Sequence, residues 1–277
     1  MRWIRKNFST VLLLVTLMIG ISLLLYPTIS DYWNSFHQSR AIAGYAEAVA
    51  EMDTVDYEKI WNDAVKYNKE LQTRSNHWFL TEEQQEEYES MLNVSDNGIM
   101  GYIEIPSIKV SLPIYHGVDE GILQVAIGHI EGSSLPVGGK GSHCVISGHR
   151  GLPSAKLFTD LDQLAEGDIF MLRVLDETLT YEVDQILIVE PNDMSSLEFD
   201  EEKDYCTLVT CTPYGINSHR LLVRGHRVAN LEESEEIRVT ADAQQIDPVL
   251  ITPALAGILL VLLLLGTFVW NRVRSRR

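Results

Sequence analysis

The sequence predicts a mainly β fold, a closed or nearly closed β-barrel that follows a helical extension and lies between two membrane spans. From Gly101 to Val228, short β-type runs alternate with Gly and Pro turns, which is typical of such barrels. Residues 31–95 instead carry apolar residues at roughly helical spacing. Near each end of the chain lies an apolar run of about 20 residues, which is long enough to cross a bilayer as a helix.

The two apolar runs are Phe8–Pro27 and Val249–Trp270, and both are rich in Leu, Ile and Val with almost no charge. The alternative, a buried core helix, would show polar residues at helical spacing, and neither run does. The first run is longer than the apolar part of a secretory signal peptide, and no small-x-small cleavage site follows it. We therefore expect an uncleaved signal anchor at 8–27 and a second transmembrane helix at 249–270.

Basic residues flank the outer end of each apolar run, in residues 1–7 and 271–277. The positive-inside rule then puts both termini in the cytoplasm and everything between the spans outside the cell. The sequence thus predicts a multi-pass protein of the cell membrane with an extracellular domain. Residues 31–248 contain 15 Lys and Arg against 39 Asp and Glu, a formal charge of −24. Such a domain is repelled by phosphate, which argues against nucleic-acid binding.

The helical extension is predicted over residues 31–95. Its central part has apolar residues at roughly helical spacing, namely Tyr57, Ile60, Trp61, Ala64, Val65 and Leu71. Thr81 and the acidic residues after it resemble the start of a short helix that runs toward Leu92. Between these helices, residues 74–79 (RSNHWF) form a polar and aromatic connector.

The β domain is predicted over residues 96–228, which is long enough for one hydrophobic core. The predicted strands are Gly101–Ile105, Val110–Ile114, Cys144–Ser147, Ile169–Val174, Thr180–Val189, Cys206–Thr210 and Leu221–Val228. A short helical connection is expected at Leu157–Leu164. Residues 229–247 are acidic and polar, and we expect an exposed tether that leads to the second span.

Three chemically active side chains stand at predicted strand ends: Cys211, His149 and Arg220. A free thiol has a pKa of about 8.5, so a cysteine nucleophile needs a base or a cation nearby. His149 can be that base and can protonate a leaving amine, whereas Arg220 stays charged and suits a developing oxyanion. Together the three are the parts of a cysteine transacylase, which passes an acyl group from a thioester to an amine or to water.

Each of the three residues also has an ordinary structural explanation. A free cysteine is often an inert core residue, a single histidine at a turn is often structural, and a strand arginine often makes a surface ion pair. Spacing along the chain does not decide between these explanations and a shared site. Only convergence of the three side chains would favour catalysis.

The chain has three cysteines, so at least one thiol is free. Cys206 and Cys211 are five residues apart, so on one regular strand they face opposite sides and should not bridge each other. Cys144 lies five residues before His149, as Cys206 does before Cys211. If those two strands are parallel neighbours, Cys144 and Cys206 are level and form a close thiol pair or a disulfide.

Several segments resemble the sortase family when they are taken in order. Residues 207–214 (TLVTCTPY) resemble the TLxTC signature of sortases, and residues 147–151 (SGHRG) are similar to their histidine segment. Residues 219–225 (HRLLVRG) resemble the arginine strand of class C sortases, the enzymes that assemble pili. Residues 131–139 (EGSSLPVGG) and 101–106 (GYIEIP) also fit that class.

The resemblance runs from about residue 40 to residue 228 and implies an eight-stranded β-barrel. It implies that His149, Cys211 and Arg220 are the catalytic residues. It also implies an LPxTG-type sorting signal as substrate, cleaved between Thr and Gly, with the acyl group passed to a lysine of the next pilin. The partners would be LPxTG-bearing pilins or surface proteins, and neither a cofactor nor a metal is expected.

The sequence departs from the class C pattern in one place. Many class C sortases have a lid with an Asp-Pro-aromatic motif over the active site, and here the matching residues are Asn76, His77 and Trp78. The aromatic residue is retained, but the acid that would pair with the catalytic arginine is absent. Residues 74–79 are therefore expected to form a lid without the charged latch, unless Trp78 is ordinary core packing.

Three other functions compete with pilin polymerisation. A cell-wall-anchoring sortase would pass the acyl group to a peptidoglycan precursor, and a cysteine hydrolase would release it to water. A membrane-held acidic binding module would have no catalytic role for Cys211. The second apolar run and the long helical extension favour the pilin enzyme.

Overall fold

The computed structural model describes residues 8–230, which fall into two units, residues 8–29 and residues 30–230. Among the described residues, helix α2 (Phe8–Ala50) alone is long and apolar enough to cross a membrane, by length and composition. The predicted second span at 249–270, both cytoplasmic ends (1–7 and 271–277) and nearly all of the tether lie outside the described residues.

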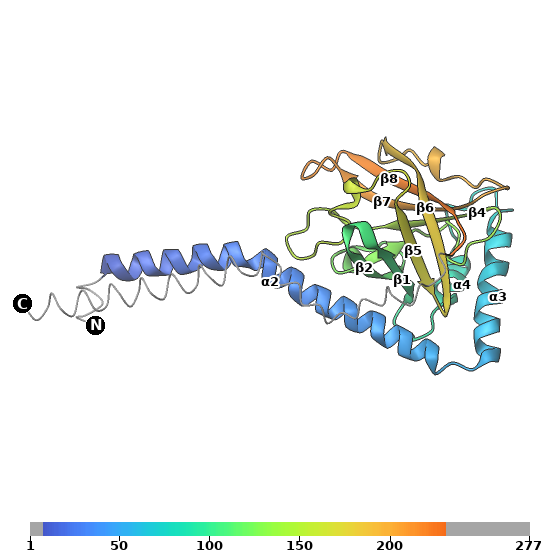
Figure 1. Cartoon of the computed structure of the whole chain (residues 1–277), viewed down its shortest axis with the longest axis horizontal. Helices are drawn as coiled ribbons and strands as arrows, with labels where there is room; N and C mark the ends of the chain where they lie inside the picture. The colour runs from blue at the N-terminus through green and yellow to red at the C-terminus, as the bar shows by residue number, and fades with distance from the viewer. Residues whose placement is uncertain (1–7, 231–277) are drawn as a thin grey trace, which may run out of the picture. The chain divides into compact units, whose positions relative to one another are not determined.

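Eight strands close into a barrel in the order β1-β2-β3-β4-β7-β8-β6-β5, as the family resemblance implies. Figure 1 shows the barrel next to the helices of the extension. The strand bounds are Ile99–Ile105 (β1), Val110–His116 (β2), Ile127–His129 (β3), Ser142–Ser147 (β4), Ile169–Val174 (β5), Glu177–Val189 (β6), Asp204–Thr212 (β7) and His219–Arg227 (β8). Two neighbouring pairs are parallel, β2 with β3 and β4 with β7, and the others are antiparallel.

The sequence pattern found seven of these strands and missed β3, which has three residues and is too short for a periodic signal. The helix expected at Leu157–Leu164 is wrong: the structure has only the 3-10 turn η2 (Leu161–Gln163) there. Leu157 has a φ of 38°, a left-handed conformation that a right-handed helix excludes. The remaining short elements are η1 (Pro106–Ile108), α5 (Glu120–Leu123) and η3 (Ser195–Leu197).

The helical extension consists of the second half of α2, helix α3 (Thr54–Leu71) and helix α4 (Glu82–Ser90). Helix α2 contains the predicted anchor, residues 8–27, and continues as one helix through Pro27. The predicted start of α4 is confirmed. Thr81 caps it with a reciprocal pair of bonds, in which its Oγ1 accepts from the Gln84 backbone N–H and the Gln84 side chain accepts from the Thr81 N–H.

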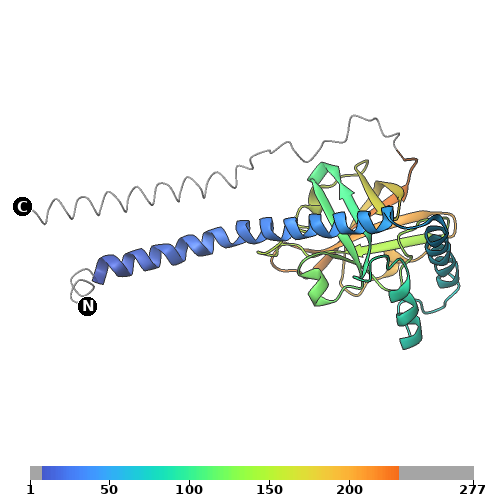
Figure 2. The ribbon, with the colours of Figure 1, turned by 90° about the horizontal axis from the view of Figure 1, so that it is seen from below.

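Helix α3 lies along one side of the barrel (Figures 1 and 2). Ala64, Tyr67 and Leu71 are buried in the same hydrophobic core as the barrel strands, which explains the helical spacing of apolar residues in this segment. Asn68 is buried beside them. Its Nδ2 donates to the Leu135 carbonyl at 3.0 Å, and its Oδ1 accepts from the Leu135 N–H at 2.7 Å.

The second half of α2 also contacts the barrel. The hydroxyl of Tyr45, which is fully buried, donates to the Met100 carbonyl at 2.9 Å and accepts from the Leu175 N–H at 2.7 Å. Nearer the start of this half, the Asn34 side chain donates to the Ser154 carbonyl at 2.8 Å. The extension is therefore a packed part of the domain.

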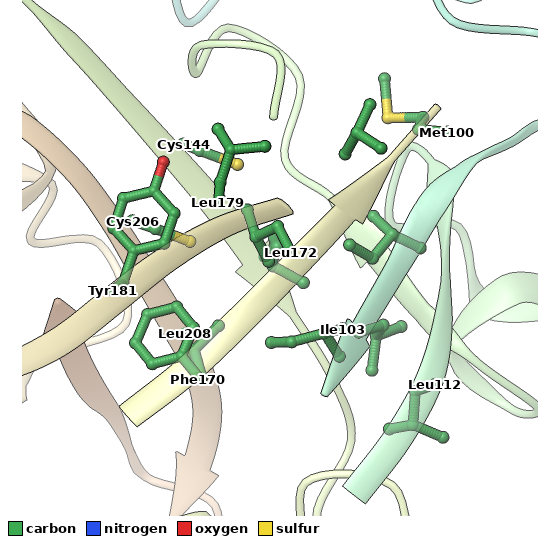
Figure 3. Close-up of a cluster of buried hydrophobic side chains, with 14 of the residues drawn as sticks. Met100, Ile103, Leu112, Cys144, Phe170, Leu172, Leu179, Tyr181, Cys206 and Leu208 are labelled. Atoms are coloured by element: carbon green, nitrogen blue, oxygen red, sulfur yellow. The ribbon is translucent and has the colours of Figure 1, made fainter. Parts of the chain in front are cut away.

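The barrel interior contains the two non-catalytic cysteines. Cys144 on β4 and Cys206 on β7 are directly opposite each other, which confirms the predicted level pairing. Figure 3 shows both among the leucine and tyrosine side chains of the core. The two thiols are free and hydrogen-bonded to each other. Burial raises the pKa of the Cys206 thiol well above its usual value, and its bond with Cys144 acts in the same direction.

We expect Asn68→Ala to lower the free energy of unfolding by about 1–3 kcal/mol, because it leaves the buried Leu135 N–H without a partner. The Leu135 carbonyl loses the Asn68 donor but keeps the Val137 N–H at 2.7 Å. Denaturant unfolding of the detergent-solubilised chain measures this. Lys69→Ala, at an exposed neighbouring position of α3, is the control and should change the free energy little. An equal loss in both variants would contradict the role given to Asn68.

We expect the native protein to incorporate one thiol label under alkylation and the unfolded, unreduced protein to incorporate three. Cys211 is partly exposed, whereas Cys144 and Cys206 are buried and free. Mass spectrometry of the intact chain gives the counts. Cys211→Ala is the control and should take up no label when native and two when unfolded. A mass deficit of two hydrogens with one label after unfolding would show a disulfide instead.

Candidate active site

The barrel brings Cys211, His149 and Arg220 together at neighbouring strand ends. Cys211 on β7 is directly opposite Arg220 on β8. On its other side β7 runs parallel to β4, and Ser147 is opposite Val209. The Gly148 N–H donates to the Val209 carbonyl at 3.0 Å, so the pairing continues one residue past β4. His149 therefore follows at the level of Cys211, with Arg220 at the opposite flank of the cysteine.

Cys211 and Arg220 also belong to one face of the sheet. Side chains alternate along a strand, and Cys206 and Leu208 point into the core, so Cys211 lies on the outer face. Leu221 and Val223 are likewise in the core, which puts Arg220 on the outer face. His149, Cys211 and Arg220 are each partly exposed, so a substrate can reach them. The expectation that Cys206 and Cys211 face opposite sides is confirmed.

Buried hydrogen bonds fix the turn that carries His149. The Thr210 hydroxyl, next to Cys211 in sequence, donates to the Gly148 carbonyl at 2.8 Å. The His149 carbonyl accepts from the Phe158 N–H at 3.1 Å. Because Thr210 is 1% exposed, water does not compete for this hydrogen bond. The bond therefore fixes the distance between the ends of β4 and β7 on the buried side of the sheet.

Within residues 8–230 the Arg220 guanidinium makes two hydrogen bonds, both to backbone carbonyls that precede it closely in the chain. One Nη1 contact is to Asn217 at 3.4 Å and the other to His219 at 3.2 Å. Within residues 8–230 no carboxylate pairs with Arg220, so the surface ion pair considered from sequence is not formed there. The guanidinium remains available to a negative charge that develops beside Cys211.

An apolar floor lies next to the three residues on the same face, formed by Val145, Leu197, Val209 and Leu222. Val209 precedes Cys211 by two residues and Leu222 follows Arg220 by two, so both are one step along the strands from the site. Other apolar side chains pack against this floor, namely Trp78, Ile130, Leu187, Val189 and Met194.

The connector 74–79 reaches the site through Trp78, which packs on the apolar floor. His77 is buried, and its Nδ1 donates to the Gly132 carbonyl at 2.7 Å. A Cβ on Gly132 would lie 2.3 Å from the His77 carbonyl oxygen, so the connector approaches the barrel where only glycine fits. Asn76 is exposed, and no hydrogen bond joins it to Arg220 among the contacts of residues 8–230.

Sequence reasoning missed Glu198, which contacts two residues of the connector. One carboxylate oxygen lies 3.5 Å from His77 Nε2 and the other accepts from Trp78 Nε1 at 3.5 Å. No local signal distinguishes Glu198 from the acidic residues around it, because its partners are about 120 positions away in the sequence. Among residues 8–230, no group of three or more His, Cys, Asp or Glu is arranged to hold a metal ion.

Comparison with known proteins identifies the family of the barrel. A Sortase domain model matches residues 103–228. The crystal structure of sortase C1 from Streptococcus agalactiae is 53% identical, with a TM-score of 0.67 over 69% of this chain and 100% of that one. Sortase C from Streptococcus pneumoniae is 47% identical, with a TM-score of 0.62 over 69% and 97%.

A third structure is sortase C from Clostridium perfringens with the C-terminal cell wall sorting motif. It is 42% identical, with a TM-score of 0.61 over 69% of this chain and 99% of that one. The chain spans about three fifths of the length of the curated relatives that it matches first, which are also sortases. The barrel, the ordered motifs and these matches agree, and the chain belongs to the sortase family, whose members are cysteine transpeptidases.

Proposed function

We propose that this chain is a membrane-anchored cysteine transpeptidase that cleaves an LPxTG-type sorting signal and transfers the acyl group to a lysine amine of another pilin. The observation that carries the proposal is the level placement of His149, Cys211 and Arg220 at three neighbouring strand ends. Membership of the sortase family supports the reaction class.

In the first half-reaction the Cys211 thiolate attacks the carbonyl carbon of the scissile Thr–Gly bond. Negative charge develops on the carbonyl oxygen, and the Arg220 guanidinium stabilises it. His149 gives a proton to the departing glycine amine, so the C–N bond breaks and a thioester to Cys211 remains. In the second half-reaction His149 takes a proton from the acceptor lysine. The amine attacks the thioester and releases the Cys211 thiolate.

The apolar floor supports a sorting signal as the substrate. The Leu and Pro of an LPxTG-type signal precede the scissile bond and need an apolar surface one step away from the nucleophile. Val209 and Leu222 offer such a surface beside Cys211 and Arg220. Trp78 already packs there, so we infer that residues 74–79 are a lid that leaves before the signal binds.

The similarity of the chain to class C sortases favours a pilin as the acceptor. Its matches include class C enzymes, and the S. pneumoniae sortase C structure gives insight into pilin substrate specificity. The long helical extension supports the same acceptor, and the matched sortase C structures cover 69% of this chain. Transfer to a peptidoglycan precursor and hydrolysis are the competing outcomes.

The purified full-length chain in detergent should convert an LPxTG-type sorting peptide and a lysine-bearing pilin into a covalent adduct. Cys211→Ala should abolish the adduct and the thioester, because binding without a nucleophile does not cleave an amide. Cys206→Ala removes a buried thiol and should retain activity. Mass spectrometry identifies the products. Free acid in the presence of the pilin would favour a hydrolase, and an adduct formed only with a peptidoglycan precursor would favour cell-wall anchoring.

We expect Trp78→Ala to speed alkylation of Cys211 in the native protein about tenfold, which corresponds to a lid contact worth roughly 1.4 kcal/mol. Phe79→Ala is the matched control, because the Phe79 side chain is 76% exposed and should not cover the site. Alkylation quenched at timed intervals and followed by mass spectrometry gives both rates. Equal rates in the two variants and the wild type would show that residues 74–79 are a plain loop.

A further inference from the structure

Two loops border the nucleophile, and Arg150 lies between them. One loop follows His149 and the other follows Cys211, where Tyr214 stands three residues after the nucleophile. The Arg150 side chain is 11% exposed and forms an ion pair with Asp162 through Nη2. Its guanidinium carbon also lies 5.9 Å from the centre of the Tyr214 ring, within the range of a cation–π contact. A single side chain thus connects the histidine loop with the cysteine loop.

The next residue brings the two loops into direct contact. Gly151 has a φ of 77°, and a Cβ at this position would lie 2.8 Å from Cε2 of Tyr214. The tyrosine ring therefore packs against the backbone of the histidine loop. The Gly151 N–H donates to Thr159 Oγ1 at 3.1 Å, which fixes the far side of the same loop.

We propose that Arg150, with Tyr214 and Asp162, is a positioning residue that holds the His149 imidazole at its working distance from Cys211. This inference rests on the transpeptidase function proposed above, in which His149 handles protons for Cys211. The hydrogen bond of Thr210 joins the ends of β4 and β7 on the buried side of the sheet. The contacts of Arg150 join the loop after His149 to the loop after Cys211 on the solvent side.

The chemistry of arginine suits this task. The edge of the planar guanidinium donates hydrogen bonds to a carboxylate while the face of the same group stacks on an aromatic ring. The ammonium of lysine is not planar and does not offer both surfaces at once. The Asp162 carboxylate also offsets the charge of Arg150, so no unpaired cation stands beside an imidazole that must become protonated.

The ordinary alternative is a structural ion pair, and the same barrel supplies a control for it. Arg224 pairs with Asp184 at 2.9 and 3.1 Å, and its guanidinium carbon lies 4.2 Å from the centre of the Tyr205 ring. This cluster has the same three residue types and is more tightly built. It joins β8, β6 and β7, and among residues 8–230 its side chains make no hydrogen bond, ion pair or ring contact with the loop after His149 or the loop after Cys211.

The test measures the pH midpoint of Cys211 alkylation in the full-length chain, a readout that needs no pilin or sorting peptide. Arg150→Lys should raise the midpoint by about one pH unit, because a displaced imidazolium no longer stabilises the thiolate. Arg224→Lys should leave it unchanged. In a His149→Ala background Arg150→Lys should cause no further shift, since the residue acts through His149.

Tyr214 gives a second test that does not depend on Arg150 variants folding, because its ring is 61% exposed. Tyr214→Phe keeps the ring contact and should keep the wild-type midpoint, whereas Tyr214→Ala should raise it. With a sorting peptide, both Arg150→Lys and Tyr214→Ala should lower kcat about 10- to 100-fold with little change in KM.

Equal midpoints in wild type, Arg150→Lys and Tyr214→Ala would overturn the inference. The inference would also be overturned if Arg224→Lys shifted the pH midpoint of Cys211 alkylation as much as Arg150→Lys does. The same holds if Arg150→Lys caused its full shift of the midpoint in the His149→Ala background. A wild-type enzyme that fails to transfer to pilin would refute the proposed acceptor and leave the alkylation result to decide the role of Arg150 by itself.

Discussion

The parallel pairing of β4 with β7 is the constraint on which the site depends. Two parallel strands end at the same edge of a sheet, so the residues that follow β4 and those that end β7 meet there. The pairing is continuous from Ser142 opposite Asp204 to Ser147 opposite Val209. A slip of one residue would turn every side chain of a strand to the other face and send Cys211 into the core. The level pair of buried cysteines belongs to this same alignment.

Parallel strands need a long connection between them, and here that connection forms part of the barrel. The segment between β4 and β7 contains the β5–β6 hairpin, and β6 then pairs with β8 to close the sheet. Arg220 is on β8, which lies between β6 and β7 in the closed sheet, and this position puts it beside Cys211. The three groups proposed for catalysis therefore come from the ends of β4, β7 and β8, which are neighbours in the sheet although β5 and β6 separate β4 from β7 in the chain.

The outer face of the same strands explains how the connector 74–79 meets the site. Val209 and Leu222 lie one step from Cys211 and Arg220, and Trp78 packs on the floor that they help to form. Within residues 8–230 the polar side-chain contacts of His77 and Trp78 go to Glu198 and to the Gly132 carbonyl rather than to Arg220. Position 76 thus has no acid to pair with Arg220, and the connector is held instead by the contacts of His77 and Trp78.

Local patterns in the sequence determined most of the elements and named the three residues proposed for catalysis. Alternation and helical spacing are encoded within a few residues, so the strands beyond three residues and the capped start of α4 were predictable. The family resemblance added the count of eight strands. The second membrane span rests on composition and remains a prediction, because it lies outside the described residues.

Only the tertiary structure decided which groups meet. Glu198 contacts a connector about 120 residues away, and Arg150 contacts a ring 64 positions later, so no local pattern indicates either contact. The helix expected at 157–164 failed for a related reason: its composition permits a helix, but the loop beside His149 holds Leu157 in a left-handed conformation. Convergence of Cys211, His149 and Arg220 likewise follows from barrel closure, since spacing along the chain leaves distances across the sheet undetermined.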